Sequence, residues 1–348
     1  MDTISIESTL GSSKYNIYLG ELSSLQFLGK VIIVTNAKIH NLHIKYLLNK
    51  IQCKDVFICL IDDGEQYKNM QTVQNILDFA FSHNLSREDS IIAFGGGVIG
   101  DITAFVAGIY KRGISFINIP TTLLSQVDAS VGGKCGVNNA FGKNLIGLFN
   151  NPKSVHIDTS FLKTLPSREF KAGLSEIIKI AICFDRDFFI WLVNANLEDE
   201  KQLIYAINKS INIKAKVVSL DWKEKSVRAK LNYAHTFGHV IELLGNYEKY
   251  LHGESISIGM RMANELAVKL GLLKLEDAKL IKSVLDRFEL TTKYKVEDVN
   301  KFYEYLFLDK KNKENKINFI LPTAIGFVEM VSNVPENIIF DVLNLEYD

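Results

Sequence analysis

The chain has 348 residues, and its 40 lysine and arginine residues are balanced by 40 aspartate and glutamate residues. The formal net charge is therefore zero, which argues against a protein that binds nucleic acid or a membrane surface through a broadly basic face. This length predicts two domains with a sizeable core, and no apolar run approaches the roughly 20 residues that a membrane-spanning helix needs.

The cysteines and the first residues indicate the compartment. The N-terminal segment has neither the basic region nor the apolar region of a secretory signal. The cysteines form no CxxC motif and predict reduced, packed thiols in a chain of this length. They are Cys53, Cys59, Cys135 and Cys183. We therefore expect a cytoplasmic protein.

Strand and helix patterns alternate through the first half of the chain. Apolar alternation over 5–19 predicts one or two strands around a turn at 11–13. Compact apolar runs predict buried strands over 30–35, 56–61, 90–94 and 116–120. Helical patterns cover 40–49, a segment that ends at Phe81 and a segment that begins at Val98. Strands and helices that alternate at this spacing indicate a parallel sheet with right-handed crossovers.

A run of glycines, Gly95 to Gly97, joins the strand over 90–94 to the helix that begins at Val98. Glycine allows a positive φ and a close approach of a ligand to the backbone. A strand, a glycine turn and a helix N-terminus together are typical of a phosphate-binding site, and a tight connection without a ligand is the alternative. Asp101, in the first helical turn, is compatible with a helix cap, a ribose contact or a metal ligand.

Polar residues follow the strand over 116–120, at the sheet edge where open α/β folds bind ligands. Thr121 and Thr122 place two hydroxyl groups just beyond this strand. Lys134 and Lys143 follow glycine turns in a segment that has few other charges. A solvated surface loop is usually more charged, so we interpret these lysines as ligands of an anion.

The pattern changes near 164–166, and from Ser167 onward it is almost entirely helical. The predicted helices cover 169–181, 188–193, 201–220, 231–244, 256–270, 275–288 and 296–306. Short strands are predicted at 316–321 and 326–330. The sequence therefore predicts an α/β nucleotide-binding domain with a parallel sheet over 1–165 and an all-α domain over 166–348.

Histidines and a glutamate in the helical half form a candidate metal site. His235 and His239 are spaced i and i+4 on one helical face, which suits two ligands of one metal ion. His252 opens the next helix, and Glu176 lies near Lys179 in an apolar helical segment. Two histidines and a glutamate are the ligand set of a catalytic zinc site with an open coordination position. Packed histidines and a structural ion pair of Glu176 with Lys179 are the alternatives.

Motifs across nearly the whole chain resemble those of the 3-dehydroquinate synthases. They are GGGVIGD (Gly95–Asp101), PTTLLSQVDASVGGK (Pro120–Lys134), GKNLIG (Gly142–Gly147), FLKTLPSRE (Phe161–Glu169), GLSEIIK (Gly173–Lys179), RAKLNYAHTFGHVIE (Arg228–Glu242) and HGESISIGM (His252–Met260). The resemblance implies conversion of 3-deoxy-D-arabino-heptulosonate 7-phosphate to 3-dehydroquinate and phosphate in the shikimate pathway of aromatic amino acid biosynthesis. It also implies transient oxidation by NAD, phosphate elimination, re-reduction and intramolecular aldol closure.

The resemblance further implies roles for individual residues. It implies that Glu176, His235 and His252 bind one divalent metal ion, zinc or cobalt, and that His239 binds the substrate phosphate. The implied NAD contacts are Asp63, Gly64, Glu65, Lys68, Gly96, Gly97, Val98, Ile99, Gly100, Asp101, Thr121, Thr122, Lys134, Lys143, Phe161, Leu162, Lys163 and Thr164. The implied catalytic and substrate-binding residues are Asp128, Lys134, Asn144, Lys179, Lys214, Arg228, Asn232, His239 and one of the pair Lys310 and Lys311.

The expected partners follow from the same resemblance. It implies a homodimer in which Arg112 reaches the phosphate site of the other subunit, and a small sugar-acid phosphate as substrate. We expect neither a nucleic acid nor a membrane as a partner. The chain departs from the usual family pattern at a few positions, none of which is an implied metal ligand. Ala234 and Ser226 stand where glycine is usual, Cys135 where threonine is usual and Asn139 where histidine is usual.

Other functions stay open at this point. A related cyclase would act on a sugar phosphate without a carboxylate, whereas Lys214, Arg228 and Asn232 favour an acidic substrate. A metal-dependent alcohol or glycerol dehydrogenase of the same two-domain layout would release reduced cofactor. A non-catalytic binding protein is disfavoured by the complete glycine turn and the complete set of metal ligands.

Overall fold

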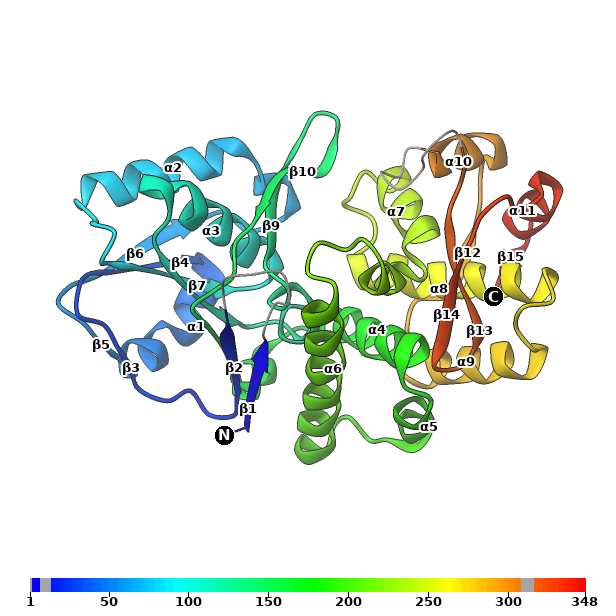
Figure 1. Cartoon of the computed structure of the whole chain (residues 1–348), viewed down its shortest axis with the longest axis horizontal. Coiled ribbons are helices and arrows are strands. Elements are labelled where there is room, and N and C mark those ends of the chain that lie inside the picture. Colours follow the sequence, from blue (N-terminus) through cyan, green and yellow to red (C-terminus); the bar gives the residue numbers. More distant parts are fainter. Residues whose placement is uncertain (1, 7–13, 308–315) are drawn as a thin grey trace. The chain divides into compact units, whose positions relative to one another are not determined.

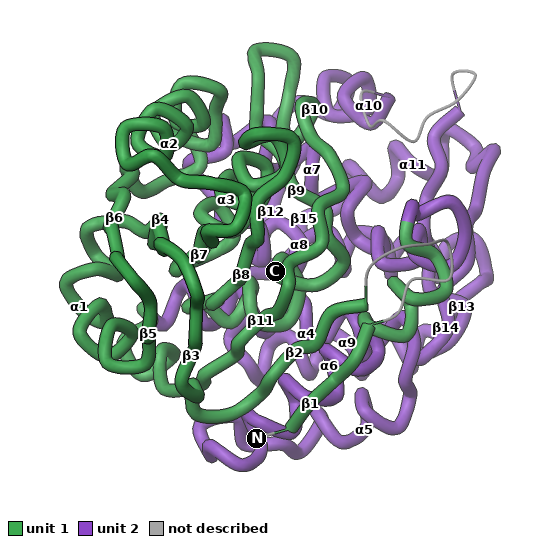
Figure 2. Tube along the Cα trace, turned by 60° about the vertical axis from the view of Figure 1, so that its left-hand side comes forward, with its two compact units in different colours: residues 1–166, 214–222 green, residues 167–213, 223–348 purple. Residues whose placement is uncertain are grey.

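The computed structural model of the chain describes residues 2–6, 14–307 and 316–348 (Figure 1). The predicted turn at 11–13 and the lysine pair at 310–311 lie outside the described residues. The chain divides into two compact units, which are coloured separately in Figure 2. Unit 1 contains residues 1–166 and 214–222, and unit 2 contains residues 167–213 and 223–348.

Unit 1 is built on a sheet with the strand order β1-β2-β11-β8-β7-β4-β6, in which β1 is antiparallel to β2 and the other pairs are parallel. The register places Ile92 of β7 between Ile33 of β4 and Ile117 of β8. The strands are β1 (Asp2–Ile6), β2 (Tyr15–Leu19), β4 (Val31–Asn36), β6 (Val56–Ile61), β7 (Ser90–Gly95), β8 (Ser115–Pro120) and β11 (Ser154–Ile157). The predicted parallel α/β fold is confirmed.

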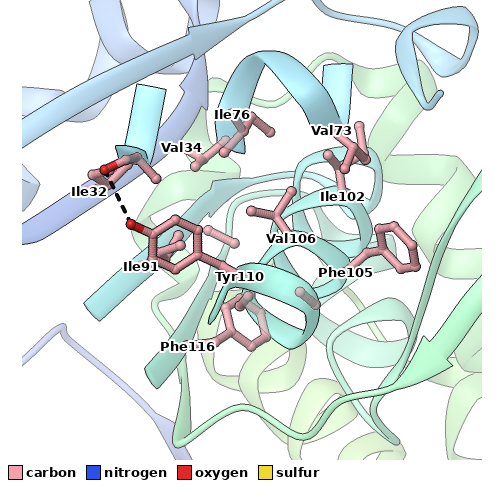
Figure 3. Packing of buried hydrophobic residues seen from close by; sticks show 14 of the residues in the cluster. Ile32, Val34, Val73, Ile76, Ile91, Ile102, Phe105, Val106, Tyr110 and Phe116 are labelled. Atoms are coloured by element: carbon pink, nitrogen blue, oxygen red, sulfur yellow. Dashed lines mark hydrogen bonds between the residues drawn. The ribbon is translucent and has the colours of Figure 1, made fainter. Parts of the chain in front are cut away.

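Helices cover both faces of this sheet. On one face, α1 (Ala37–Leu48) packs Ile44 and Leu47 into a cluster with Ile33 of β4. On the other face, α2 (Met70–Ser82) and α3 (Gly97–Ile109) pack against side chains such as Ile32 (Figure 3). All residues of β4 and β7 are buried, which explains why these strands are apolar without alternation.

A β-hairpin that the sequence analysis did not predict packs on α3. It consists of β9 (Lys134–Asn139) and β10 (Gly142–Phe149). Gly136 and Gly147 are paired in its register, and a Cβ on Gly136 would lie 2.5 Å from the carbonyl oxygen of Ile146. These glycines let the two backbones approach closely, but they also remove the alternation by which a strand is recognised in a sequence. A short parallel pair, β3 (Leu25–Gln26) with β5 (Ile51–Gln52), completes the described strands of unit 1.

Unit 2 is mostly helical, as predicted, and α8 (His252–Lys269) is its central element. α8 is buried along most of its length and contacts α7, α4, β13, α11 and α9. The other helices are α4 (Ser167–Phe184), α5 (Arg186–Asn194), α6 (Glu200–Leu220), α7 (His235–Leu244), α9 (Leu275–Arg287), α10 (Val299–Leu306) and α11 (Glu336–Leu343). The part of α6 from Lys214 onward belongs to unit 1. Two strand pairs accompany the helices, β13 (Phe319–Ala324) with β14 (Phe327–Val331) and β12 (Tyr294–Lys295) with β15 (Glu346–Tyr347). Only the first pair was predicted. None of the described helices is long and apolar enough to span a bilayer.

The helix predicted over 231–244 is wrong in its first turn. Residues 227–232 form 3-10 turns, and α7 begins only at His235. The chain breaks at Ala234, which has a left-handed backbone with φ of 72°. This conformation costs an alanine about 1 kcal/mol or more, so the surrounding packing must impose it.

Buried His156 makes the stability of unit 1 depend on pH. It stacks on Tyr18 with a ring distance of 4.9 Å, and burial lowers its pKa from 6.5 to about 4. The unfolded chain therefore takes up a proton first as the pH falls below 6.5, and the folded chain does so only near pH 4.

Between pH 7 and pH 5, we expect the free energy of unfolding to fall by about 2 kcal/mol more in the parent protein than in His156→Phe. Phenylalanine keeps the stacked ring and removes the titrating group. Urea unfolding at the two pH values measures this difference. Parallel pH profiles for the two proteins would show that His156 is not a buried neutral imidazole.

Candidate metal and nucleotide sites

The glycine turn of unit 1 joins a strand to a helix N-terminus as predicted, but none of its three glycines has a positive φ. Gly95 ends β7, Gly96 precedes the first residue of α3, and the N–H of Thr121 donates to the carbonyl of Gly95 at 2.9 Å. A Cβ on Gly95 would lie 2.4 Å from Ile99, so no other residue fits there without a shift. Thr122 borders the turn, because a Cβ on Gly96 would lie 3.2 Å from its methyl group. The N-terminus of α3 thus faces polar groups with its positive dipole end.

A network of charged and amide side chains surrounds the first turn of α3. The ammonium group of Lys68, which is 5% exposed, donates to Asp101 Oδ2 at 2.5 Å and to Asn144 Oδ1 at 2.6 Å. Burial lowers the pKa of Lys68, but the charges of Asp101 and Glu65 outweigh it and raise the pKa above its ordinary value. Lys68 is therefore protonated, and Asp101 is an ion-pair partner rather than a helix cap.

The hairpin contributes to the same region. Asn138 donates from its side chain to Glu65 Oε1 at 2.8 Å, and Lys143 lies 3.9 Å from the same oxygen. Four predicted NAD contacts, Glu65, Lys68, Asp101 and Lys143, therefore lie close to one another. Asn144, predicted to meet the substrate, belongs to this network through Lys68.

The segment over 161–164 packs Phe161 on the face of the sheet that α1 covers, beside the end of β7. Phe161 is 2% exposed and packs against Phe94, so its side chain belongs to the core. Only its backbone can meet a ligand. The Thr164 hydroxyl is 2.8 Å from His43 Nε2, a partner that sequence analysis did not find.

A π-helical turn over 125–129 places Asp128 beside Lys214. The Lys214 ammonium donates to the carbonyl oxygen of Asp128 at 2.6 Å and also to its carboxylate. Lys214 is 5% exposed, whereas the Asp128 side chain is half-buried, so one side of this pair stays open to solvent. Two residues that are distant in sequence and that the resemblance assigns to the substrate thus contact each other. Lys134, by contrast, is exposed at the start of β9.

In unit 2, among the described residues, one group of side chains could hold a metal ion. It consists of Glu176, His235 and His252, whose ligand atoms all lie within 4.8 Å of one another. His252 Nε2 is 3.5 Å from Glu176 Oε1, close to the roughly 3.3 Å that separates two ligands about 2 Å from a tetrahedral ion. One carboxylate and two imidazoles suit zinc or cobalt, so these residues fit such an ion.

Close backbone contacts bring these ligands together from α4, α7 and α8. A Cβ on Gly253 would lie 2.0 Å from the carbonyl oxygen of Ala172, and one on Gly259 would lie 2.3 Å from that of Ala234. α8 can therefore touch both α4 and the start of α7. His239 is near this group, with its ring 5.2 Å from that of His235, but it is not a member. The spacing-based pairing of His235 with His239 is thus replaced by the pairing of His235 with His252.

The surroundings of the histidines orient them toward the ion. His235 Nδ1 lies 3.0 Å from the carbonyl oxygen of Tyr233, so Nε2 is the ring nitrogen that would bind a metal ion. Burial lowers the pKa of His252, but the charge of Glu242 and hydrogen bonds with Glu176 and Glu242 raise it to about 10. A metal ion must displace that proton to bind, because imidazole coordinates in its neutral form.

The remaining substrate candidates of unit 2 lie on α4, on α7 and in the turns over 227–232. The Lys179 ammonium is 2.5 Å from Glu176 Oε2, and both side chains are buried. Arg228 is 3% exposed. Asn232 donates to Glu224 Oε1 at 2.6 Å. Sequence analysis missed Glu224 and Glu242: Glu224 lies in an ordinary charge run, and Glu242 is two helical turns beyond His235 on the same face.

Solved structures with the same fold define the class of protein. 2-Deoxy-scyllo-inosose synthase, solved with carbaglucose-6-phosphate, NAD+ and Co2+, matches with a TM-score of 0.85 and 27% identity over 99% of both chains. 2-epi-5-epi-valiolone synthase from Streptomyces hygroscopicus subsp. jinggangensis 5008, solved with NAD+ and Zn2+, matches with a TM-score of 0.87 and 25% identity over 97% of this chain and 98% of the other. The chain therefore has the fold of the sugar-phosphate cyclases.

Sequence comparison identifies the family within this class. The family description "3-dehydroquinate synthase N-terminal" matches residues 58–172, and "3-dehydroquinate synthase C-terminal" matches residues 173–312. A 3-dehydroquinate synthase of a Nitratiruptor species is 54% identical over 96% of each chain. One of Helicobacter hepaticus (strain ATCC 51449 / 3B1) is 52% identical over 96% of this chain and 95% of the relative. The chain belongs to the 3-dehydroquinate synthase family, which confirms the resemblance found in its motifs.

We expect His235→Ala and Glu176→Gln to lose the divalent ion and nearly all turnover while they keep their helical content. A site with three protein ligands cannot lose one without a large fall in affinity. Metal analysis after gel filtration and circular dichroism measure the two quantities. His40→Ala, which removes an imidazole remote in sequence from all three ligands, should retain the ion. If either ligand variant keeps its metal and its turnover, the assignment is wrong.

Proposed function

We propose that the protein converts 3-deoxy-D-arabino-heptulosonate 7-phosphate to 3-dehydroquinate and phosphate, a step of the shikimate pathway. The observation that carries this proposal is the Glu176, His235 and His252 group, with ligand atoms within 4.8 Å, in a chain of the 3-dehydroquinate synthase family. Buried thiols at Cys59, Cys135 and Cys183 suit the reducing cytoplasm, where we place the enzyme.

The proposed enzyme uses NAD and one divalent metal ion, zinc or cobalt. NAD supplies a hydride acceptor that becomes the hydride donor later in the same turnover, so no reduced cofactor is released. The metal ion supplies a Lewis acid that lowers the pKa of a bound substrate hydroxyl group. The relatives of this fold solved with NAD+ and with Zn2+ or Co2+ support both assignments. In this chain the glycine turn and Lys68 would hold the cofactor, and Glu176, His235 and His252 would hold the ion.

The other residues have roles that follow from their charge and their donor groups. Lys134, Asn144 and His239 would donate hydrogen bonds to the dianionic substrate phosphate. Arg228 would bind the carboxylate in bidentate fashion, and its burial makes that contact stronger. Asp128 would hold Lys214 in place for the substrate. The departing phosphate would itself accept the adjacent carbon-bound proton.

A carboxylate on the substrate separates this proposal from that of a related cyclase that uses a sugar phosphate without a carboxylate. Arg228 is held in the 3-10 turns over 227–232, and Asn232 is oriented in the same turns by Glu224. A guanidinium group matches the two oxygens of a carboxylate in bidentate fashion, and a substrate with a carboxylate offers that contact in addition to its phosphate. A dehydrogenase activity has weaker support, because the match to a probable glycerol dehydrogenase, at 15% identity, reflects the fold alone.

We expect phosphate release from the heptulosonate phosphate to require NAD+ and to stop when a chelator removes the metal ion. We also expect no net formation of NADH during turnover, because the cofactor is regenerated in every cycle. A coupled phosphate assay and absorbance in the NADH band measure the two products. Stoichiometric NADH would contradict the cyclase and favour a dehydrogenase.

We further propose a homodimer in which Arg112 binds the substrate phosphate of the other subunit. Arg112 is exposed, follows α3 and has a left-handed backbone with φ of 66°. α3 has 13 residues, so its length of about 20 Å separates Arg112 from the glycine turn of its own chain. In a two-fold dimer, a residue remote from its own site can lie beside that of the partner.

Arg112→Ala should weaken substrate binding strongly, because a charge-assisted phosphate contact is lost. Mixing Arg112→Ala with Lys134→Ala should restore roughly a quarter of normal activity, because about half of the dimers are mixed and each has one intact site. Phosphate release after demonstrated subunit exchange measures this. No recovery would show that Arg112 acts within its own chain, and full activity of Arg112→Ala alone would make it an ordinary solvated turn residue.

A further inference from the structure

The buried carboxylate of Glu242 lies against the metal-site histidine His252. Its side chain is 4% exposed, and Glu242 Oε2 is 3.4 Å from His252 Nδ1, at the long end of hydrogen bonding. The other ring nitrogen, Nε2, is the one that lies 3.5 Å from Glu176 Oε1. The two nitrogens of one imidazole thus face two different carboxylates.

This arrangement determines which tautomer of His252 can bind a metal ion. A metal ion needs the lone pair of Nε2, so the ring proton must reside on Nδ1. The proton then points at Glu242 Oε2 and can be donated to it. An ion bound at Nε2 withdraws electron density from the ring and makes Nδ1–H a stronger donor, while the carboxylate makes Nε2 a stronger ligand.

The other histidine ligand is oriented in a different way. His235 Nδ1 meets the backbone carbonyl of Tyr233 at 3.0 Å, a neutral acceptor that any residue at position 233 would provide. His252 Nδ1 instead faces a charged side chain. Glu242 also lies at i+7 from His235, on the same face of α7, so one helix carries both a ligand and the partner of another ligand.

The charges in this cluster favour the same role for Glu242. Glu176 and Lys179 form a buried pair with no net charge. A divalent ion bound beside this pair would add two positive charges to a group in which Glu176 is buried and the two histidines are half-buried. Glu242 supplies one compensating negative charge next to a ligand and reduces the cost of taking the ion partly out of water.

We propose that Glu242 is a positioning residue of the metal site, which holds His252 in its metal-binding tautomer and partly balances the charge of the ion. This rests on the metal site of the proposed function but not on its substrate. Glu242→Gln keeps the size of the side chain and an acceptor oxygen but removes the charge. Glu242→Leu removes both.

Affinity for Co2+ is measured by chelator competition on the metal-stripped protein, with no substrate present. We expect Kd to rise about 10-fold for Glu242→Gln and up to about 100-fold for Glu242→Leu. We also expect the visible spectrum of bound Co2+ to change in Glu242→Gln, which a merely structural role would not cause. Glu248→Gln, an exposed glutamate just after α7, is the matched control and should bind Co2+ as the parent does.

A double-mutant cycle tests whether Glu242 acts through His252. In the His252→Ala background, measured at higher Co2+ concentration, Glu242→Gln should raise Kd by a smaller factor than in the parent background, because only the contribution of its charge remains. A parent-like Kd and spectrum for Glu242→Gln would overturn the proposal, and so would an equal effect in the His252→Ala background. A parent protein that binds no Co2+ would overturn this proposal together with the metal site itself, whereas the wrong substrate would leave all these results unchanged.

Discussion

The metal group depends on backbone-to-backbone contact between helices. Gly253 of α8 lies against the carbonyl of Ala172 in α4, and Gly259 of α8 lies against the carbonyl of Ala234 just before α7. A Cβ at either glycine would enter the space of a backbone oxygen, which cannot move aside as a flexible side chain can. Because the helices touch at these points, ligands that begin on three different helices reach one small volume. Ala234 adopts a left-handed conformation in the same contact.

In unit 1, too, glycines allow close backbone contacts, and buried charged side chains lie near them. The turn at Gly95 to Gly97 brings α3 close to β7, and Gly136 and Gly147 bring the strands of the hairpin close to each other. Lysines can be buried in such close packing only with partners, and Lys68 has Asp101 while Lys214 has Asp128. Such pairs are costly to desolvate and contribute little stability by themselves. Their position beside the glycine turn and the π-helical turn suits the binding of a charged cofactor and a charged substrate.

Much of this organisation could be predicted from local patterns. Compact apolar runs mark the strands β6 and β8, and apolar periodicity marks the helices of unit 2; both depend only on neighbouring residues. The hairpin β9–β10 was not predicted, because its glycines, which let the two strands approach closely, remove the alternation by which a strand is recognised in a sequence. The first turn of the helix predicted over 231–244 was wrong for another reason: the backbone of Ala234 is imposed by the packing of α8, not by the preference of alanine.

The sequence alone determined the parallel α/β fold, the helical second half, the glycine turn and the kinds of side chain that a metal ion needs, since all of these are properties of short segments. Spacing favoured His239 over His252 as the partner of His235, because the i and i+4 rule describes a single helix. The tertiary structure brings the start of α8 to the start of α7, and it therefore places His252 in the metal group and leaves His239 beside it. It also places Glu242 against His252, a contact between two helices that no local pattern encodes.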